Sequence, residues 1–162
     1  MSSTLYLANT MIWHANERGV RLTNLRLQKL LYLLYTKYYY YTKHALFYER
    51  FVAWQYGSAL FSIYSVFKGE GADPIIKCRP DANGNRLMCS VVGDFAELFD
   101  YIWGNYAYKS AKYLVGLTRG EETPGYETAW RKAYKNGEGE GGFLADQDIL
   151  EDGELWFSPG SN

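Results

Sequence analysis

The hydrophobic positions between Leu22 and Lys43 recur every three or four residues, which is the spacing of one face of an α-helix. The side chains on this face are Leu27, Leu30, Leu31, Leu34, Tyr38 and Tyr41. Thr23 can cap the first turn with its hydroxyl, and Leu22 can pack against Leu27 across the cap. The pattern predicts one long central helix. Its other faces also carry aromatic rings, so we expect it to contact several elements.

The same spacing predicts a helix on either side of this one. The first would be capped by a serine at position 2 or 3 and ended by Gly19 in a left-handed conformation. A third helix would begin near Ser58 and end at Gly69. Residues 45–57, between the second and third helices, are apolar at nearly every position. This run fits either a short helix or a buried extended segment.

Capping signals predict the later helices. Asp94 and Glu97 have the spacing of a capping box, and Ser110 can cap the stretch that follows it. Thr123 followed by proline is typical of an N-cap and a first helical position, so we expect a helix from there through Tyr134. Residues 143–150 are expected to add one or two helical turns.

A change of period between Asp73 and Val92 predicts a small β-hairpin. Two apolar runs flank Asn83-Gly84, a strong hairpin signal. A two-residue turn would set Cys78 opposite Cys89, but it would also place Pro80 at a hydrogen-bonded pair, where proline has no N–H to donate. We therefore expect a longer loop, and packed, reduced cysteines rather than a disulfide.

These elements predict a mainly α (α+β) fold: a compact helical domain of about six helices with one small β-hairpin. We assign residues 1–135 to the domain and residues 136–162 to a glycine-rich connector and an acidic C-terminal segment. Residues 1–135 carry seventeen basic and eleven acidic side chains, a net charge of +6, whereas residues 136–162 carry seven acidic side chains and no basic one. The acidic segment can fold back on the basic body, bind a basic partner or stay solvated.

Composition points to a single soluble domain that binds a partner. The chain has 162 residues, of which 48% are apolar, and no run long enough to span a bilayer. Its start lacks the basic residues of a signal peptide, so we expect a cytoplasmic protein. Sixteen tyrosines stand among 29 aromatic residues. Because tyrosine tolerates both burial and water, this content favours a protein-binding surface, although core-rim tyrosines are the simpler explanation for any single one.

Groups for catalysis are scarce. The two histidines, His14 and His44, lie in or beside predicted helices, and no serine or cysteine stands in a nucleophile motif. Glu121 and Glu122 lack metal-ligand spacing, and the glycine-rich run after residue 135 lacks the features of a phosphate-binding loop. We therefore expect no metal, no cofactor and no enzymatic activity.

Two sequence blocks carry a family resemblance. Residues 25–32 read LRLQKLLY, and the second block contains Glu49, Ala53-Trp54, Tyr56-Gly57, Tyr64 and Phe67-Lys68. Together they resemble the SocA-like Panacea antitoxin domain of bacteria, prophages and phages. The likeness covers about residues 4–135.

A third block matches this family in part. Ser110, Leu117-Thr118 and Pro124 agree with its pattern. Ser58, Arg119 and Gly125 stand where the family has proline, histidine and tryptophan. The resemblance implies a mostly helical domain with a small hairpin, which neutralises a cognate toxin by direct protein contact.

We expect a few aromatic anchors to carry partner binding: Tyr32, Tyr35, Tyr39 and Tyr40. The family-motif residues to which we assign a structural role are Leu27, Gln28, Lys29, Leu30, Leu31, Trp54, Tyr56, Gly57, Tyr64 and Ser110. Gln28 and Lys29 are expected to pair with the loop around Trp54 to Gly57, which would explain why the first two blocks occur together.

Other roles stay open at the level of sequence. Some relatives deliver their toxin to a host protease as adaptors, and a phage-encoded inhibitor of another bacterial protein, or a homodimer, fits the same residues. A nucleic-acid-binding regulator is disfavoured, because the charge of +6 is spread along the chain rather than gathered in a stripe. No membrane contact is expected.

Overall fold

The structure, a computed structural model, describes residues 3–137 and 141–160. This part of the chain forms seven α-helices, one 3-10 turn and a three-stranded antiparallel sheet. The helices are α1 (Thr4–Arg18), α2 (Asn24–Thr42), α3 (Phe61–Phe67), α4 (Gly93–Tyr106), α5 (Ala111–Arg119), α6 (Ala129–Asn136) and α7 (Asp146–Phe157), and the 3-10 turn is η1 (Lys68–Glu70). The predicted mainly α fold is confirmed.

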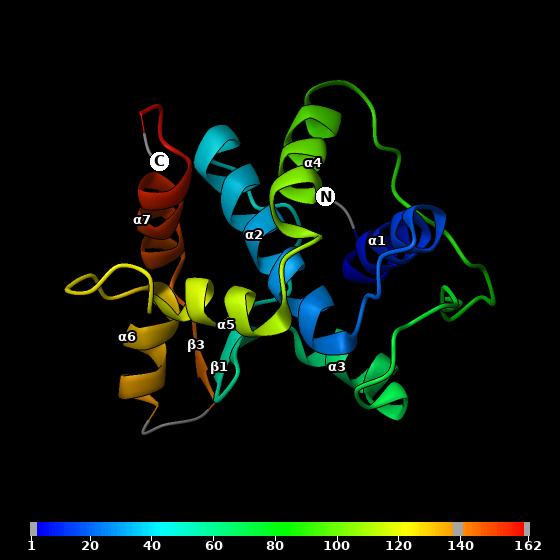
Figure 1. The fold of residues 1–162 in the computed structure, drawn as a ribbon, viewed down its shortest axis with the longest axis horizontal. Helices are drawn as coiled ribbons and strands as arrows, with labels where there is room; N and C mark the ends of the chain where they lie inside the picture. Colours follow the sequence, from blue (N-terminus) through cyan, green and yellow to red (C-terminus); the bar gives the residue numbers. More distant parts are fainter. Residues whose placement is uncertain (1–2, 138–140, 161–162) are drawn as a thin grey trace.

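Helix α2 lies at the centre of the molecule, with α1, α4, α5 and α7 around it (Figure 1). Its residues from Leu27 to Lys37 are all buried, so no face of this part of the helix meets solvent. The Thr23 hydroxyl accepts a hydrogen bond from the Arg26 backbone N–H at 3.3 Å, as predicted. The leucine pattern therefore identified the central helix and its cap.

The sheet packs beside α2. Strands β1 (Val52–Trp54) and β2 (Gly57–Ala59) form a tight hairpin in which Trp54 pairs with Gly57. Strand β3 (Gly142–Phe143) pairs with the other edge of β1. The apolar run at residues 45–57 is thus an extended segment that ends in a strand, which settles the ambiguity left by its composition.

The hairpin predicted between Asp73 and Val92 is wrong. Its turn exists, because the Asp81 carboxylate accepts backbone hydrogen bonds from Asn83 and Asn85, but no strand flanks it. The flanking segments bond instead to α1, whose Asn9 amide donates to the Leu87 carbonyl at 3.0 Å. Hydrogen bonds to side chains of α1 thus take the place of the backbone hydrogen bonds that would have joined the two predicted strands. Neither cysteine forms a disulfide.

Some predicted helix starts also differ from the structure. Helix α4 begins after Val92, and Asp94 does not cap it. Helix α6 begins after Thr128, whose hydroxyl accepts the Arg131 N–H, so Thr123 and its proline do not open it. Helix α3 starts at Phe61 rather than near Ser58. Gly19 and Ser110 were predicted correctly as the end of α1 and the cap of α5.

The acidic C-terminal segment folds back on the body. Helix α7 lies along α2, and Leu144, Ile149 and Phe157 belong to the same buried cluster as the α2 leucines (Figure 1). The glycine-rich connector precedes it, and residues 138–140 of that connector lie outside the described residues.

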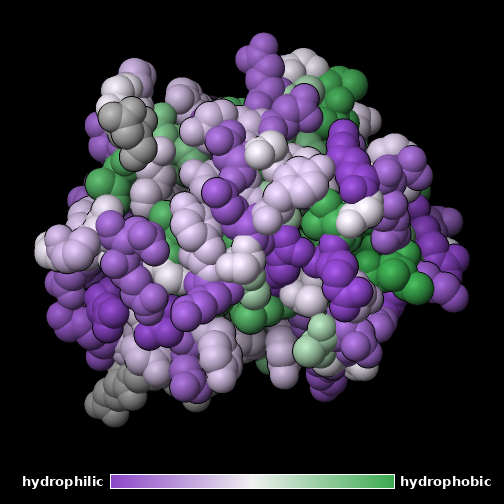
Figure 2. Space-filling model, viewed as in Figure 1, coloured by the Kyte–Doolittle hydropathy of each residue, from purple (hydrophilic) through white to green (hydrophobic). Residues whose placement is uncertain are grey.

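The exposed surface shows no broad apolar face in the view of Figure 2, where hydrophobic side chains form small, separate patches. Tyrosines appear pale on this scale, so an aromatic surface does not stand out by colour. Among the described helices, none is both long and apolar enough to cross a membrane.

Candidate functional site

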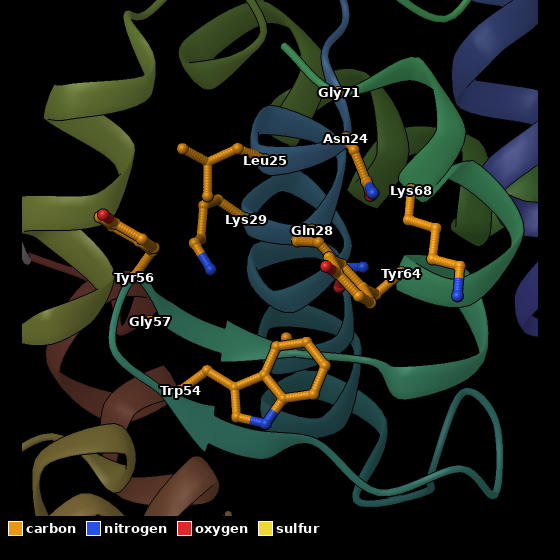
Figure 3. Close-up of a pocket in the computed structure, with 11 residues that line it drawn as sticks. Asn24, Leu25, Gln28, Lys29, Trp54, Tyr56, Gly57, Tyr64, Lys68 and Gly71 are labelled. Carbon is orange, nitrogen blue, oxygen red and sulfur yellow. The ribbon is translucent and has the colours of Figure 1, made fainter. Parts of the chain in front are cut away.

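A pocket of about 280 Å³ opens between the first turns of α2, the β1–β2 hairpin and α3 (Figure 3). Its lining residues are Asn24, Leu25, Gln28, Lys29, Trp54, Tyr56, Gly57, Ala59, Tyr64, Lys68 and Gly71. Six of the ten family-motif residues are among them. The two motif blocks, whose nearest pocket-lining members Lys29 and Trp54 are 25 residues apart in sequence, therefore meet at one place on the surface.

Two polar side chains of α2 hold the strand hairpin in place. The Gln28 amide accepts from the Leu60 N–H at 2.8 Å and donates to the Leu60 carbonyl at 3.3 Å. The Lys29 ammonium donates to the Ser58 carbonyl at 2.8 Å. The predicted pairing of Gln28 and Lys29 with the second block is correct in kind, but the partners follow Gly57 rather than precede it.

Gly57 allows this close approach of helix and hairpin. Its φ of 108° is a backbone conformation that other residues rarely adopt. A Cβ at this position would lie 2.9 Å from Lys29 Nζ. Glycine here and lysine in α2 are thus parts of one packing arrangement, which gives the co-occurrence of the two motif blocks a physical cause.

Aromatic rings form the walls and rim of the pocket. Trp54 packs edge-on against Tyr64 at 5.2 Å and against Phe61 at 6.3 Å between ring centroids. Tyr56, Phe61 and Tyr64 are 61%, 62% and 43% exposed, so much of their ring surface meets solvent. Tyr56 and Tyr64 line the pocket, whereas Phe61 lies outside its lining and contacts Trp54; we call these three residues the aromatic rim. The Trp130 indole N–H donates a hydrogen bond to the Trp54 carbonyl at 2.7 Å. This bond holds β1, the strand that contains Trp54, in position beside the pocket.

The pocket is electrostatically one-sided. Its lining contains two lysines, Lys29 and Lys68, and no carboxylate. Burial, together with the charge of Arg119, lowers the pKa of Lys29 to about 7. The site therefore favours anionic over cationic groups.

Two of the four tyrosines predicted to bind a partner belong to the core instead. Tyr32 is fully buried, and its hydroxyl donates to the Asp152 carboxylate at 2.7 Å. Tyr35 is 5% exposed and packs against Phe47 with ring centroids 4.8 Å apart. Both turn toward α7 and the segment before β1, because α2 is surrounded on all sides, so the assignment of these two as surface anchors is wrong. Tyr39 and Tyr40 are half-buried, and their role in binding stays a prediction.

The remaining motif residues serve the fold. Leu27, Leu30 and Leu31 are fully buried, and the Ser110 hydroxyl accepts the Tyr113 N–H at the start of α5. Sequence reasoning missed the pocket because it treated Gln28 and Lys29 as structural and looked for the site among the tyrosines further along α2. The signal that could have indicated the pocket was the presence of two polar residues, Gln28 and Lys29, inside a motif of leucines.

The geometry defines a class of protein: a mainly α domain built around one buried helix, with a cationic, aromatic pocket beside the start of that helix. The family model described as antitoxin SocA-like, Panacea domain, matches residues 27–124, and the chain belongs to this family. The match includes every pocket residue except Asn24 and Leu25. Comparison with curated proteins and with solved structures gave no significant match.

Proposed function

We propose that this domain neutralises a toxin by binding it directly, with the aromatic rim as the contact surface. The observation that carries the proposal is the convergence of the family-motif residues on one pocket with exposed rings around it. Gln28, Lys29 and Gly57 line the pocket but also hold the hairpin on α2, so their presence in the motif has a structural cause. Tyr56 and Tyr64 are 61% and 43% exposed, and exposed motif rings beside a pocket are better explained by contact with a partner.

The chemistry of the rim suits protein recognition. Tyr56, Phe61 and Tyr64 each present a large ring with few rotatable bonds, and the Trp54 ring packs edge-on against the last two. Such rings carry much of the binding energy in protein interfaces, particularly where they border a pocket. Inhibition by covering the toxin needs no reactive group, so we propose a binding protein rather than an enzyme.

Co-expression tests this function. The product of the gene adjacent to the one encoding this chain is induced in bacteria with and without the chain. The proposal predicts growth arrest by the adjacent product alone, restored growth with the chain, and co-purification of the two proteins. Arrest that persists despite normal expression of the chain, or rescue without a complex, contradicts neutralisation by direct binding.

A further inference from the structure

The inner wall of the pocket holds a buried ammonium group with unused donors. Lys29 is 1% exposed, and its Nζ makes one hydrogen bond in the described part of the chain, to the Ser58 carbonyl at 2.8 Å. An ammonium group has three N–H donors. In Figure 3 this group points into the space between Tyr56 and Gln28, above Gly57 and Trp54. A ligand in the pocket can therefore supply acceptors that the protein does not.

A second polar group of the lining also lacks a partner. Asn24 is 7% exposed, and its Oδ1 atom is buried without a hydrogen bond to any of the described residues. Its side chain points toward Tyr64 and Lys68, across the pocket from Lys29 (Figure 3). Buried acceptors are normally paired, so an unpaired one in a pocket indicates a donor that arrives with a ligand.

Charge and shape narrow the chemistry of that ligand. Lys29 and Lys68 line the pocket, and no lining residue is acidic. A carboxylate would offset this accumulation of positive charge. The ring faces of Trp54 and Tyr64 provide an apolar surface beside it.

We propose that the pocket binds a carboxylate carried next to an apolar group and an N–H donor. Lys29 pairs with the carboxylate, Asn24 Oδ1 accepts the N–H, and the aromatic wall covers the apolar part. An amino acid with a blocked amine has these three features, and so does the C-terminal residue of a polypeptide. This inference rests on the proposed function, because both assign binding to the same pocket. It adds the chemical group that a partner would insert into that pocket.

The test uses the full chain and two matched probes, N-acetylphenylalanine and its C-terminal amide. Binding is followed by the backbone N–H resonances of Tyr56 and Gly57 in an NMR titration. We expect the acid to shift both resonances and the amide to bind at least about tenfold more weakly, a difference of about 1.4 kcal/mol. Equal binding of both probes, or no shift at about 10 mM acid, overturns the proposal.

Two variants assign the contacts. Asn24→Asp places a carboxylate in the pocket and an acidic residue in the first turn of α2, where it suits the helix dipole, so this variant should fold. We expect it to weaken acid binding at least tenfold, whereas Asn105→Asp on the exposed side of α4 leaves it unchanged. Lys29→Met should also lose the preference for the acid. Unchanged binding of the acid by a folded Asn24→Asp variant overturns the proposal.

A competition arm separates the two sources of the carboxylate. If N-acetylphenylalanine displaces the adjacent-gene protein from its complex, the partner's chain end supplies the group. If the acid binds without displacing it, a free small molecule does. Partner binding without acid binding contradicts this inference alone, whereas acid binding without neutralisation contradicts the proposed function alone.

Discussion

Lys29 belongs both to the packing of the fold and to the lining of the proposed binding pocket. Its ammonium group is buried and ties α2 to β2, yet burial makes the charged form unfavourable. The folded pKa of about 7 lies below the ordinary value of 10.5. Above the unfolded pKa, the Lys29 amine is neutral in both states and its burial carries no charge penalty. As the pH falls from the unfolded pKa to the folded pKa, the unfolded state binds a proton that the folded state does not, so the stability of the folded state decreases. Lys29 therefore opposes folding most strongly at and below pH 7.

This linkage predicts a pH-dependent difference between the wild type and Lys29→Met. Between pH 7 and pH 9, the free energy of unfolding of the wild type should rise by about 2 kcal/mol relative to the variant, because methionine has no proton to lose. Urea denaturation at both pH values measures it. Lys77→Met, at an exposed lysine, controls for loss of a surface charge. If the difference in unfolding free energy between the wild type and Lys29→Met is the same at pH 7 and pH 9, the Lys29 ammonium is solvated in the folded protein.

Sequence could place single residues on a helix but not bury them. Tyr32 and Lys29 both lie off the leucine face of α2. Tyr32 was assigned to the binding surface, whereas Lys29 was expected to pair with the loop around Trp54 to Gly57. Their burial depends on Asp152 and Ser58, which are 120 and 29 residues away. No local pattern contains that information, which is why the anchor prediction failed at Tyr32 and Tyr35.

At the scale of elements, the packing of α7 on α2 depends on a glycine. A Cβ at Gly153 would lie 2.6 Å from the Tyr40 Cβ and 3.2 Å from the Thr36 carbonyl oxygen. Asp152 beside it accepts hydrogen bonds from the hydroxyls of Tyr32 and Tyr126, at 2.7 and 3.0 Å. Helix α7 is thus held on α2 by a close backbone approach and a buried carboxylate, while its surface carboxylates Asp148 and Glu151 pair with Lys132 of α6 at 3.2 and 3.3 Å.

Gly153→Ala should destabilise the protein by about 1–3 kcal/mol, because the helices must separate to admit the methyl group. The matched control is Gly104→Ala in α4, where nothing lies within 4 Å of the added Cβ. There the gain in helix propensity should stabilise by up to about 1 kcal/mol. Thermal denaturation of both variants measures the contrast. Stabilisation by both substitutions would contradict the close packing of α7.

Local signals identified some helix ends correctly, although the caps predicted at Asp94 and Thr123 do not form. The caps at Thr23 and Ser110 and the stop at Gly19 were predicted because each acts within one turn of its own helix. The hairpin after Asp73 failed because Asn9 of α1 takes the hydrogen bonds that a second strand would have made. The turn after Asp81 was predicted correctly, because it depends on neighbouring residues. Whether its flanking segments pair with each other depends on contacts with distant parts of the chain.

At the scale of the whole molecule, the chain beyond the family match completes the core. Leu144, Ile149 and Phe157 are each buried to 4% exposure or less. Burying one such side chain contributes about 1.5–3 kcal/mol, so the three together rival the total stability of about 5–15 kcal/mol of a typical domain. The C-terminal segment is therefore a structural part of this chain.

A chain that ends at Asn136 should not unfold cooperatively, because it lacks β3 and α7 and leaves Tyr32 without its partner Asp152. A chain that ends at Gly160 keeps both elements and should melt like the full-length protein. Circular dichroism against temperature distinguishes them. A cooperative transition in the shorter chain, near the wild-type temperature, would show that residues 1–136 fold independently.

If the aromatic rim binds the toxin, changes to its rings must raise the dissociation constant of the complex with the adjacent-gene protein. Calorimetry would compare the wild type, the double variant Tyr56→Ala with Tyr64→Ala, and Tyr48→Ala, whose ring is 81% exposed but outside the pocket. We predict at least about 30-fold weaker binding for the double variant, with a wild-type melting temperature, and about unchanged binding for Tyr48→Ala. Wild-type affinity in the double variant, or an equal loss with Tyr48→Ala, would show that the aromatic rim is not the binding surface.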